Sequence, residues 1–191
     1  ASYVAALAHE MPLEEFASVE NTLFTKIFSL VNSKDSTVSD RMSGIFAMDH
    51  LLDVSSSDEE KKAIKFANNL SNSLRASGDY DFLAAATRAL GRMAMGSANA
   101  DFVEFEVSRA LEWLKSERPD RRLAATLTLK ALARNAPTTF YSKTNQSAHG
   151  AGSNEFIENI FPVIRDSQPI VRACAVDALS ECLQFLIKRH H

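Results

Sequence analysis

Small and apolar residues recur along the chain at one helical spacing, in four separate segments. In each segment, five positions follow one another at intervals of three, three, one and three residues. The four sets are Arg41-Gly44-Ala47-Met48-Leu51, Leu83-Ala86-Ala89-Leu90-Met93, Arg122-Ala125-Thr128-Leu129-Leu132 and Arg172-Ala175-Ala178-Leu179-Cys182. This spacing places each set on one face of an α-helix, where small side chains let a neighbouring helix approach closely. The pattern therefore predicts four packed helices of one kind.

A second helical segment precedes each of these stripes. The four segments cover residues 19–31, 58–75, 101–115 and 154–165. Their apolar residues at helical spacing are Val19, Leu23, Ile27, Leu30 and Val31 in the first segment, Ala63, Ala67, Leu70 and Leu74 in the second, Val103, Val107, Ala110, Leu111 and Leu114 in the third, and Phe156, Ile157, Ile160, Phe161 and Ile164 in the fourth. Each stripe is thus expected to form the second helix of a pair.

The first positions of successive stripes are 42, 39 and 50 residues apart. A period near 40 residues made of two helices is typical of HEAT and armadillo solenoids. The expected fold is all-α, a right-handed superhelical solenoid of antiparallel helix pairs that runs through residues 1–191. We expect a helix fragment at 1–12, about four repeats at 19–54, 58–96, 101–135 and 154–188, and a mobile loop at 142–153, where large apolar side chains are missing.

Composition and charge narrow the function classes. The chain has 191 residues, 24% of them charged, and a net charge of −3 with dispersed basic residues. Nucleic acid is therefore not an expected partner, because phosphate binding requires clustered Lys and Arg. No apolar stretch is long enough for membrane insertion.

Cys174 and Cys182, eight residues apart on one helix, favour a reducing, cytoplasmic setting. His190 and His191 are either native or a remnant of a purification tag.

No catalytic, cofactor-binding or metal-binding residues are expected. The six glycines are scattered, so they form no phosphate-binding loop, and segments like those that hold phosphates and magnesium in kinases are missing. His9, His50 and His149 lie far apart, without partners at metal-ligand spacing. The acidic run at 58–60 fits the first turn of a helix, where it favours the macrodipole.

The densest cluster of charges falls in the predicted turn between the helices of the third repeat. Lys115, Arg118, Asp120 and Arg121 are candidates for an edge that contacts a protein partner. The alternative is a solvated edge of mixed charge.

Arginine recurs at the first stripe position in three of the four repeats. Arg41, Arg122 and Arg172 could form a structural ladder between repeats, with Asp40, Asp120 and Asp166 as the acidic partners. A role in ligand binding is the alternative. In the remaining repeat, the second, this position is Leu83, so charge is dispensable there.

Aromatic residues give the first helix of the third repeat a second apolar face. Phe102, Phe105 and Trp113 are either packing residues of a stacked helix or a surface that binds a partner.

Particular segments also resemble a known family. DFVEFEVSRALEWLK at 101–115, ALGRMAM at 89–95 and GIFAMDHLL at 44–52 are similar to the N-terminal HEAT region of the TOR (target of rapamycin) protein kinases, within the PI3K-related kinases. The resemblance extends from about residue 20 to 187 and includes RRLAATLTLKALARNAPTTFY and VRACAVDALSECL. The loop at 142–153 departs from the family, which joins these repeats tightly.

The resemblance implies a non-catalytic scaffold within a serine/threonine kinase whose ATP and magnesium would bind in a catalytic domain elsewhere. It implies a platform for the assembly and regulation of a TOR complex that controls growth in response to nutrients. Implied partners are a Raptor-like subunit, a Rheb-like small GTPase and the remainder of the TOR polypeptide, in the cytoplasm or at the vacuolar or lysosomal membrane surface. The alternatives are a HEAT scaffold of an unrelated transport or phosphatase complex and, as a third class, a helical enzyme.

Overall fold

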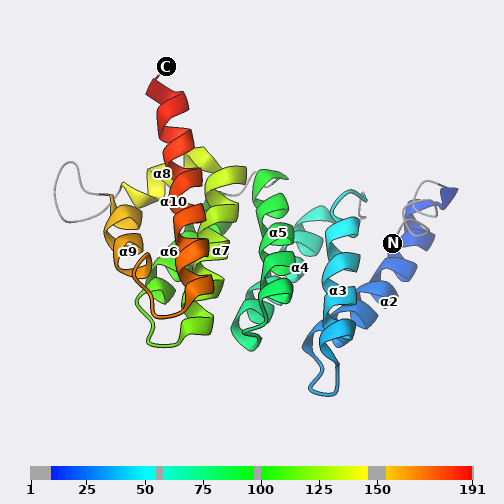
Figure 1. Ribbon diagram of the computed structural model, residues 1–191. Helices are drawn as coiled ribbons and strands as arrows, with labels where there is room; N and C mark the ends of the chain where they lie inside the picture. Colours follow the sequence, from blue (N-terminus) through cyan, green and yellow to red (C-terminus); the bar gives the residue numbers. More distant parts are fainter. Residues whose placement is uncertain (1–9, 55–57, 97–99, 146–153, 191) are drawn as a thin grey trace. The chain divides into compact units, whose positions relative to one another are not determined.

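The computed structural model describes residues 10–54, 58–96, 100–145 and 154–190, and these contain helices and no strand. The helices, drawn in Figure 1, are α2 (Leu13–Asn32), α3 (Val38–Leu51), α4 (Glu59–Ala76), α5 (Tyr80–Gly96), α6 (Ala100–Leu114), α7 (Pro119–Asn135), α8 (Pro137–Thr144), α9 (Glu155–Val163) and α10 (Pro169–His190). This arrangement confirms the expected all-α helical-repeat class. The helix fragment expected at 1–12 lies mostly outside the described residues.

The helices fall into two compact units, Ala1–Ala76 and Ser77–His191. The division lies between α4 and α5, the two helices of the second expected repeat. Each unit has its own buried core.

In the first unit, α2 packs against both α3 and α4. The buried face of α2 carries Phe16, Glu20, Phe24, Ile27 and Val31. This face is rotated from the expected one, because Val19 and Leu30 of the predicted set are exposed. The larger phenylalanine side chains bury more apolar area, so they face the core in place of the smaller residues.

Aromatic contacts join α2 to α4. The ring of Phe66 packs edge-on against Phe24 and Phe28, with centroids 5.1 and 5.9 Å apart. Phe66 is completely buried, whereas Ala63 of the predicted stripe is exposed. The core of this unit is therefore built around phenylalanines that are absent from the apolar residues expected at helical spacing in these two helices.

A glycine permits the close approach of α3 to α2. A Cβ atom added to Gly44 would lie 2.5 Å from Cγ2 of Val31 and 3.3 Å from the carbonyl oxygen of Ile27. Val31 is buried and its branched side chain is restricted at χ1, so it cannot move aside easily. Gly44, one of the expected stripe positions, is thus required by packing.

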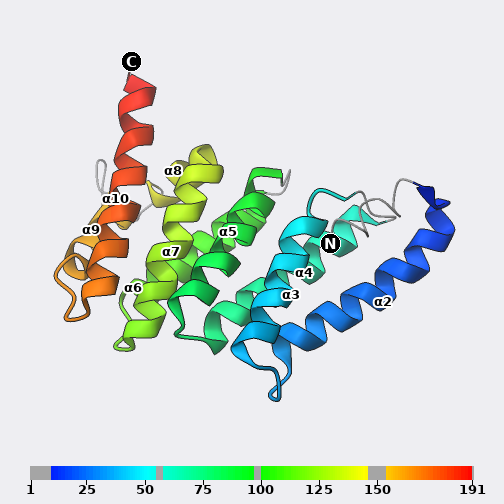
Figure 2. The ribbon, with the colours of Figure 1, turned by 45° about the vertical axis from the view of Figure 1, so that its right-hand side comes forward.

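In the second unit, α7 lies between α5 and α10, as both ribbon views show (Figures 1 and 2). It also packs against α6. The seven residues from Leu123 to Leu129 are all buried, as are Leu132 and Ala133. A helix enclosed in this way needs small or apolar side chains around its whole circumference, which the sequence of α7 provides.

Prolines begin two of the long helices of this unit. Pro119 and Pro169 are the first residues of α7 and α10, where the missing N–H group costs no helical hydrogen bond. Pro162 lies inside α9, which ends one residue later at Val163. A proline inside a helix removes one backbone donor, and α9 stops here without continuing through a bend.

The short helix α8 was not expected from the sequence. It extends helical structure to Thr144, three residues into the segment 142–153 that was predicted to be a loop. Phe140 and Thr144 are buried, and Phe140 packs edge-on against Phe156 of α9 at 5.4 Å between ring centroids. These contacts explain why the helix forms. Residues 146–153 lie outside the described residues.

Asn154 connects the end of α8 to the start of α9. Its amide nitrogen donates to Thr144 Oγ1 at 3.2 Å and to Asn145 Oδ1 at 3.1 Å, and its side-chain oxygen caps α9 by accepting from the N–H of Ile157. The two ends of the intervening segment are thus held together.

The packing at Gly44 predicts that Gly44→Ala lowers the free energy of unfolding. The clash with Val31 should outweigh the higher helix propensity of alanine, for a net loss of about 1–2 kcal/mol in urea denaturation. Ser43→Ala, at an exposed position of the same helix, is the control and should change stability by less than about 0.5 kcal/mol. A stabilised Gly44→Ala variant would contradict the close approach.

Candidate protein-interaction surface

The turn between α6 and α7 holds the charged residues that the sequence proposed as a contact edge. Arg118 and Asp120 form a two-pronged ion pair, with Nε 3.1 Å from Oδ1 and Nη2 2.5 Å from Oδ2. This hydrogen bonding lowers the pKa of Asp120 and raises that of Arg118. Lys115 is exposed, and no ion pair is observed for it within the described chain.

Arg121, the fourth candidate, is half-buried and turned toward α6. Its guanidinium carbon lies 5.3 Å from the centre of the Trp113 ring, and that of Arg109 lies 4.7 Å from it. Trp113 is only 6% exposed, so it acts as a packing residue flanked by two cations. Lys115 and Arg118 are exposed in the turn before α7, whereas Asp120 and Arg121 are half-buried in the first turn of that helix.

Sequence reasoning missed a buried ion pair on α6. Glu106 and Arg109, spaced three residues apart, are both buried and contact each other. A charged pair of opposite sign within an otherwise apolar helical face was the signal that could have revealed it. Because the carboxylate neutralises Arg109 next to Trp113, the cluster can remain buried.

The three residues of the candidate aromatic surface differ in exposure. Phe105 is 59% exposed, whereas Trp113 on the same helix is buried, and Phe102 lies between these extremes. Of the three aromatic residues, Phe105 is the one most available to a partner.

Arg122 makes the contact that links the third and fourth expected repeats. Its Nε atom donates to a carboxylate oxygen of Asp166, which lies in the turn after α9. Its Nη1 atom donates to the carbonyl oxygens of Ser116 and Glu117 at 2.7 and 2.8 Å. Arg122 thus covers carbonyl groups in the turn after α6 and also reaches the next helix pair.

Arg172 makes the same backbone contacts as Arg122. Its Nη1 atom donates to the carbonyl oxygens of Asp166 and Ser167 at 2.8 and 3.1 Å, six and five residues earlier in the chain, as in Arg122. Asp166 therefore contacts both arginines, one through its side chain and one through its backbone.

Arg41 has a related position in the first unit. Its Nη2 atom donates to the carbonyl oxygen of Ser33 at 3.2 Å. Asp40, proposed as a ladder partner, instead forms a capping box with Thr37, and these hydrogen bonds lower the pKa of Asp40. An arginine ladder along the whole chain stays a prediction.

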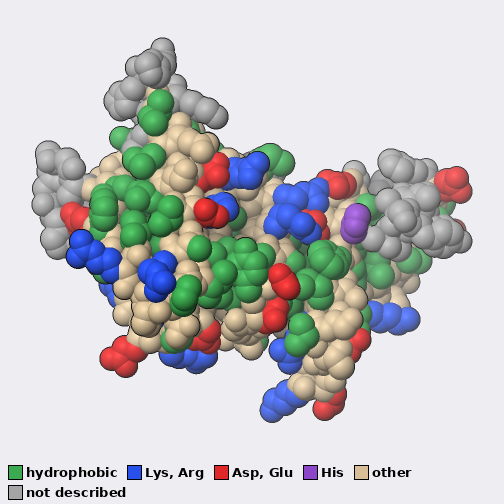
Figure 3. Space-filling model, in the orientation of Figure 1, with side chains coloured by type: hydrophobic (Ala, Val, Ile, Leu, Met, Phe, Trp, Pro, Cys, Tyr) green, Lys and Arg blue, Asp and Glu red, His purple; other side chains and the backbone are tan. Residues whose placement is uncertain are grey.

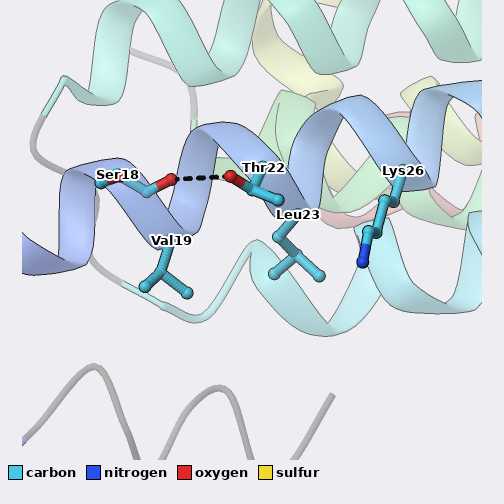
Figure 4. A pocket seen from close by; sticks show the side chains of 5 residues that line it. All are labelled: Ser18, Val19, Thr22, Leu23 and Lys26. Atoms are coloured by element: carbon cyan, nitrogen blue, oxygen red, sulfur yellow. Dashed lines mark hydrogen bonds between the residues drawn. The ribbon is translucent and has the colours of Figure 1, made fainter.

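A shallow hollow lies on α2, and Figure 4 shows its lining. Val19 and Leu23 form its apolar part, and Lys26 lies at one end. The hydroxyl of Thr22 donates to the carbonyl oxygen of Ser18 at 3.1 Å, so it is already satisfied within the helix. The lining lacks the convergent polar groups that a catalytic site requires.

Among the described residues, no cluster of three or more His, Cys, Asp or Glu side chains could hold a metal ion. None of the described helices is long and apolar enough to cross a membrane. Cys174 and Cys182 are buried free thiols, and burial raises the pKa of Cys182 to about 11.

The fold defines an all-α helical-repeat protein. No family model matches the chain. It is, however, similar over nearly its whole length to TOR serine/threonine protein kinases. Identity is 34% with tor1 of Schizosaccharomyces pombe over 98% of the chain, and 34% with TOR2 of Saccharomyces cerevisiae over 97%. It is also 34% with TOR of Arabidopsis thaliana, over 87% of the chain.

The chain spans only a small part of these relatives. It corresponds to 8% of the length of each yeast protein and 6% of the plant protein. The resemblance to TOR kinases is thus confirmed for one segment of those much longer polypeptides.

The contact between Arg122 and Asp166 predicts a pH-dependent contribution to stability. Asp166→Asn should lower the free energy of unfolding at pH 7 by roughly 2 kcal/mol, because it leaves the partly buried guanidinium without its carboxylate. The hydrogen bond from Arg122 lowers the pKa of Asp166 from its usual value of 3.8. The contribution is therefore complete above about pH 3.8 and is lost as pH falls through the lower pKa of the folded state.

Urea denaturation at pH 7 and pH 3 tests this expectation. The difference between Asp166→Asn and the unchanged chain should shrink at pH 3. Asp177→Asn is a matched control, because Asp177 pairs with Lys130 of α7 at 2.7 Å but is mostly exposed. It should cost about 0.5 kcal/mol or less. Equal losses for the two variants at pH 7 would contradict the special position of Asp166.

Proposed function

We propose that this chain is a non-catalytic HEAT-repeat segment from the N-terminal region of a TOR-type serine/threonine kinase, and that it acts as a scaffold for protein partners. The observation that carries the proposal is the 34% identity to TOR kinases across nearly the whole chain, within only 6–8% of their length. A match of this extent covers nearly the whole chain, so it is not limited to a single shared motif.

The chemistry of the surface supports a scaffold. Among the described residues, charges occur in turns and on exposed helix faces, often in ion pairs, and the hollow on α2 lacks converging acids and bases. Catalysis of phosphoryl transfer would require groups that hold phosphates and magnesium in one place. ATP and magnesium would accordingly bind in the catalytic domain of the parent kinase.

The partners proposed for the segment are a Raptor-like subunit, a Rheb-like small GTPase and the remainder of the kinase polypeptide. The setting would be the cytoplasm, with the assembled complex at the vacuolar or lysosomal membrane surface, where it would control growth in response to nutrients. A HEAT scaffold of a transport or phosphatase complex is the alternative, but the identity to TOR kinases favours the first proposal.

The turn between α6 and α7 is the proposed contact edge, and charge reversal tests it. We expect Lys115→Glu combined with Arg118→Glu to weaken capture of a purified Raptor-like subunit by about tenfold, because repulsion would replace attraction at an exposed edge. Both side chains are exposed, so the fold should survive. The measurement is a titration by surface plasmon resonance at two salt concentrations.

Arg134→Glu provides the control for this experiment. Arg134 is exposed in the last turn of the same helix, α7, at the end opposite the proposed edge. Its reversal should leave capture unchanged. If the double variant binds as well as the unchanged chain, the edge is not the contact surface, and the scaffold must use another face.

A further inference from the structure

One side of α6 carries an exposed aromatic ring among carboxylates. Asp101, Phe105, Ser108 and Glu112 follow one another at intervals of four, three and four residues, so they lie along one side of the helix. All four residues are exposed, and the exposed fraction of Phe105 is 59%. Within the described chain, no ion pair is observed for the carboxylate of Glu112. We call these four residues the α6 outer stripe.

The buried side of the same helix shows how this chain holds an arginine. Glu106, Arg109 and Trp113 follow one another at intervals of three and four residues, and all three are buried. The carboxylate of Glu106 contacts the guanidinium of Arg109, and the guanidinium carbon lies 4.7 Å from the centre of the Trp113 ring. A carboxylate and an aromatic ring seven positions apart on the helix therefore share one guanidinium.

The exposed side repeats this spacing without an arginine. Ser108 lies three residues after Phe105 and four before Glu112, so the ring and the carboxylate have exchanged places and a small residue occupies the middle position. The hydroxyl of Ser108 donates to the carbonyl oxygen of Glu104 at 2.9 Å, so it is already satisfied within the helix. The space over Ser108 is therefore suited to a guanidinium supplied from outside the chain.

Further carboxylates lie near this position. Glu104 precedes Ser108 by one helical turn, and Glu158 is exposed on α9, which packs against α6. Lys143 of α8 lies 4.0 Å from Glu104 and offsets part of this charge. The carboxylates make the surroundings of Ser108 favourable to a cation.

The side of the second unit formed by α7 and α10 has a different charge pattern. Figure 3 shows basic and acidic side chains close together on the face that it presents, and Lys130 of α7 pairs with Asp177 of α10. Charges of opposite sign satisfy each other there. The α6 outer stripe contains two carboxylates and no cation, so it complements a basic partner.

We propose that the α6 outer stripe binds an arginine from a basic segment of a protein partner. The guanidinium lies over Ser108, stacks on the ring of Phe105 and pairs with the carboxylate of Glu112. Further basic residues of the segment face Asp101 and Glu104. Arginine fits this site better than lysine, because its planar guanidinium stacks on a ring and also donates paired hydrogen bonds to a carboxylate.

This surface is separate from the basic contact edge in the turn between α6 and α7, and it has the opposite charge. The inference rests on the proposed function in one respect, that the chain is a scaffold for protein partners. It adds the chemical class of a partner segment, which the proposed function does not specify.

Fluorescence anisotropy with a labelled peptide tests the proposal. The probe is an amphipathic peptide with several arginines on one helical face, and matched peptides carry lysine or neutral citrulline in their place. Each peptide is titrated with the 191-residue chain and with single variants whose folding is checked by circular dichroism. The variants are Phe105→Ala, Glu112→Gln and Ser108→Arg. Tyr80→Ala and Glu117→Gln, at exposed positions outside the stripe, are the matched controls.

The arginine peptide should bind the unchanged chain about threefold more tightly than the lysine peptide, and the citrulline peptide should not bind. Phe105→Ala should weaken binding by roughly threefold through the lost stacking contact, and Glu112→Gln by about fivefold through the lost ion pair. Ser108→Arg should abolish binding, because its own guanidinium would occupy the space between the ring and the carboxylate. Both controls should bind as the unchanged chain does.

Three results would overturn the proposal. The first is unchanged binding by both Phe105→Ala and Glu112→Gln. The second is unchanged binding by Ser108→Arg. The third is equal affinity for the arginine and lysine peptides, which would indicate general attraction to negative charge.

The same titrations separate this inference from the proposed function. If the arginine peptide does not bind while Lys115→Glu with Arg118→Glu still weakens capture of a Raptor-like subunit, the inference fails and the proposed function stands. If the arginine peptide binds as expected but the unchanged chain captures no Raptor-like subunit, the α6 outer stripe is supported and the proposed partner is wrong.

Discussion

Enclosure of α7 on several sides is the constraint on which the second unit depends. A helix that contacts α5, α6, α8 and α10 has little surface on which a large polar group could reach water. Its interior therefore consists of Ala, Leu and Thr, and the hydroxyls of Thr126 and Thr128 are satisfied by carbonyl oxygens three and four residues earlier in the helix. The distances from α7 to its neighbouring helices depend on these residues, because small side chains on α7 let those helices pack closely.

Because the buried faces of α7 exclude charge, its ionic contacts lie at the helix ends and at its partly exposed positions. Arg122 stands in the first turn of α7 and satisfies both carbonyl groups and the Asp166 carboxylate. Lys130 reaches Asp177 at a partly exposed position. Apolar burial thus supplies the stability of the helix pairs, and the pairs are kept in register by hydrogen bonds that only one alignment satisfies.

Much of the fold could be predicted from periodicity, because an interior helix such as α7 shows its stripe in the sequence. The first helices were harder. On α2 two apolar faces compete, and the choice of Phe24 over Val19 depends on the ring of Phe66 opposite, which no local pattern shows. The candidate site had the same limit. Spacing identified Arg122 and offered Asp40, Asp120 and Asp166 as acidic partners. Only packing selects Asp166, which lies 44 residues away from Arg122.

Asn154 permits the segment between α8 and α9 to vary in length. By binding Thr144 and Asn145 while it caps α9, this side chain closes the base of the segment between them. The hydrogen bonds of Asn154 then position the helix pairs on either side, and the path of the intervening residues does not. Adding residues there costs little more than loop closure, about 0.6 kcal/mol for each doubling of length. A repeat array built in this way can acquire a new surface segment between two pairs without altering the packing of either.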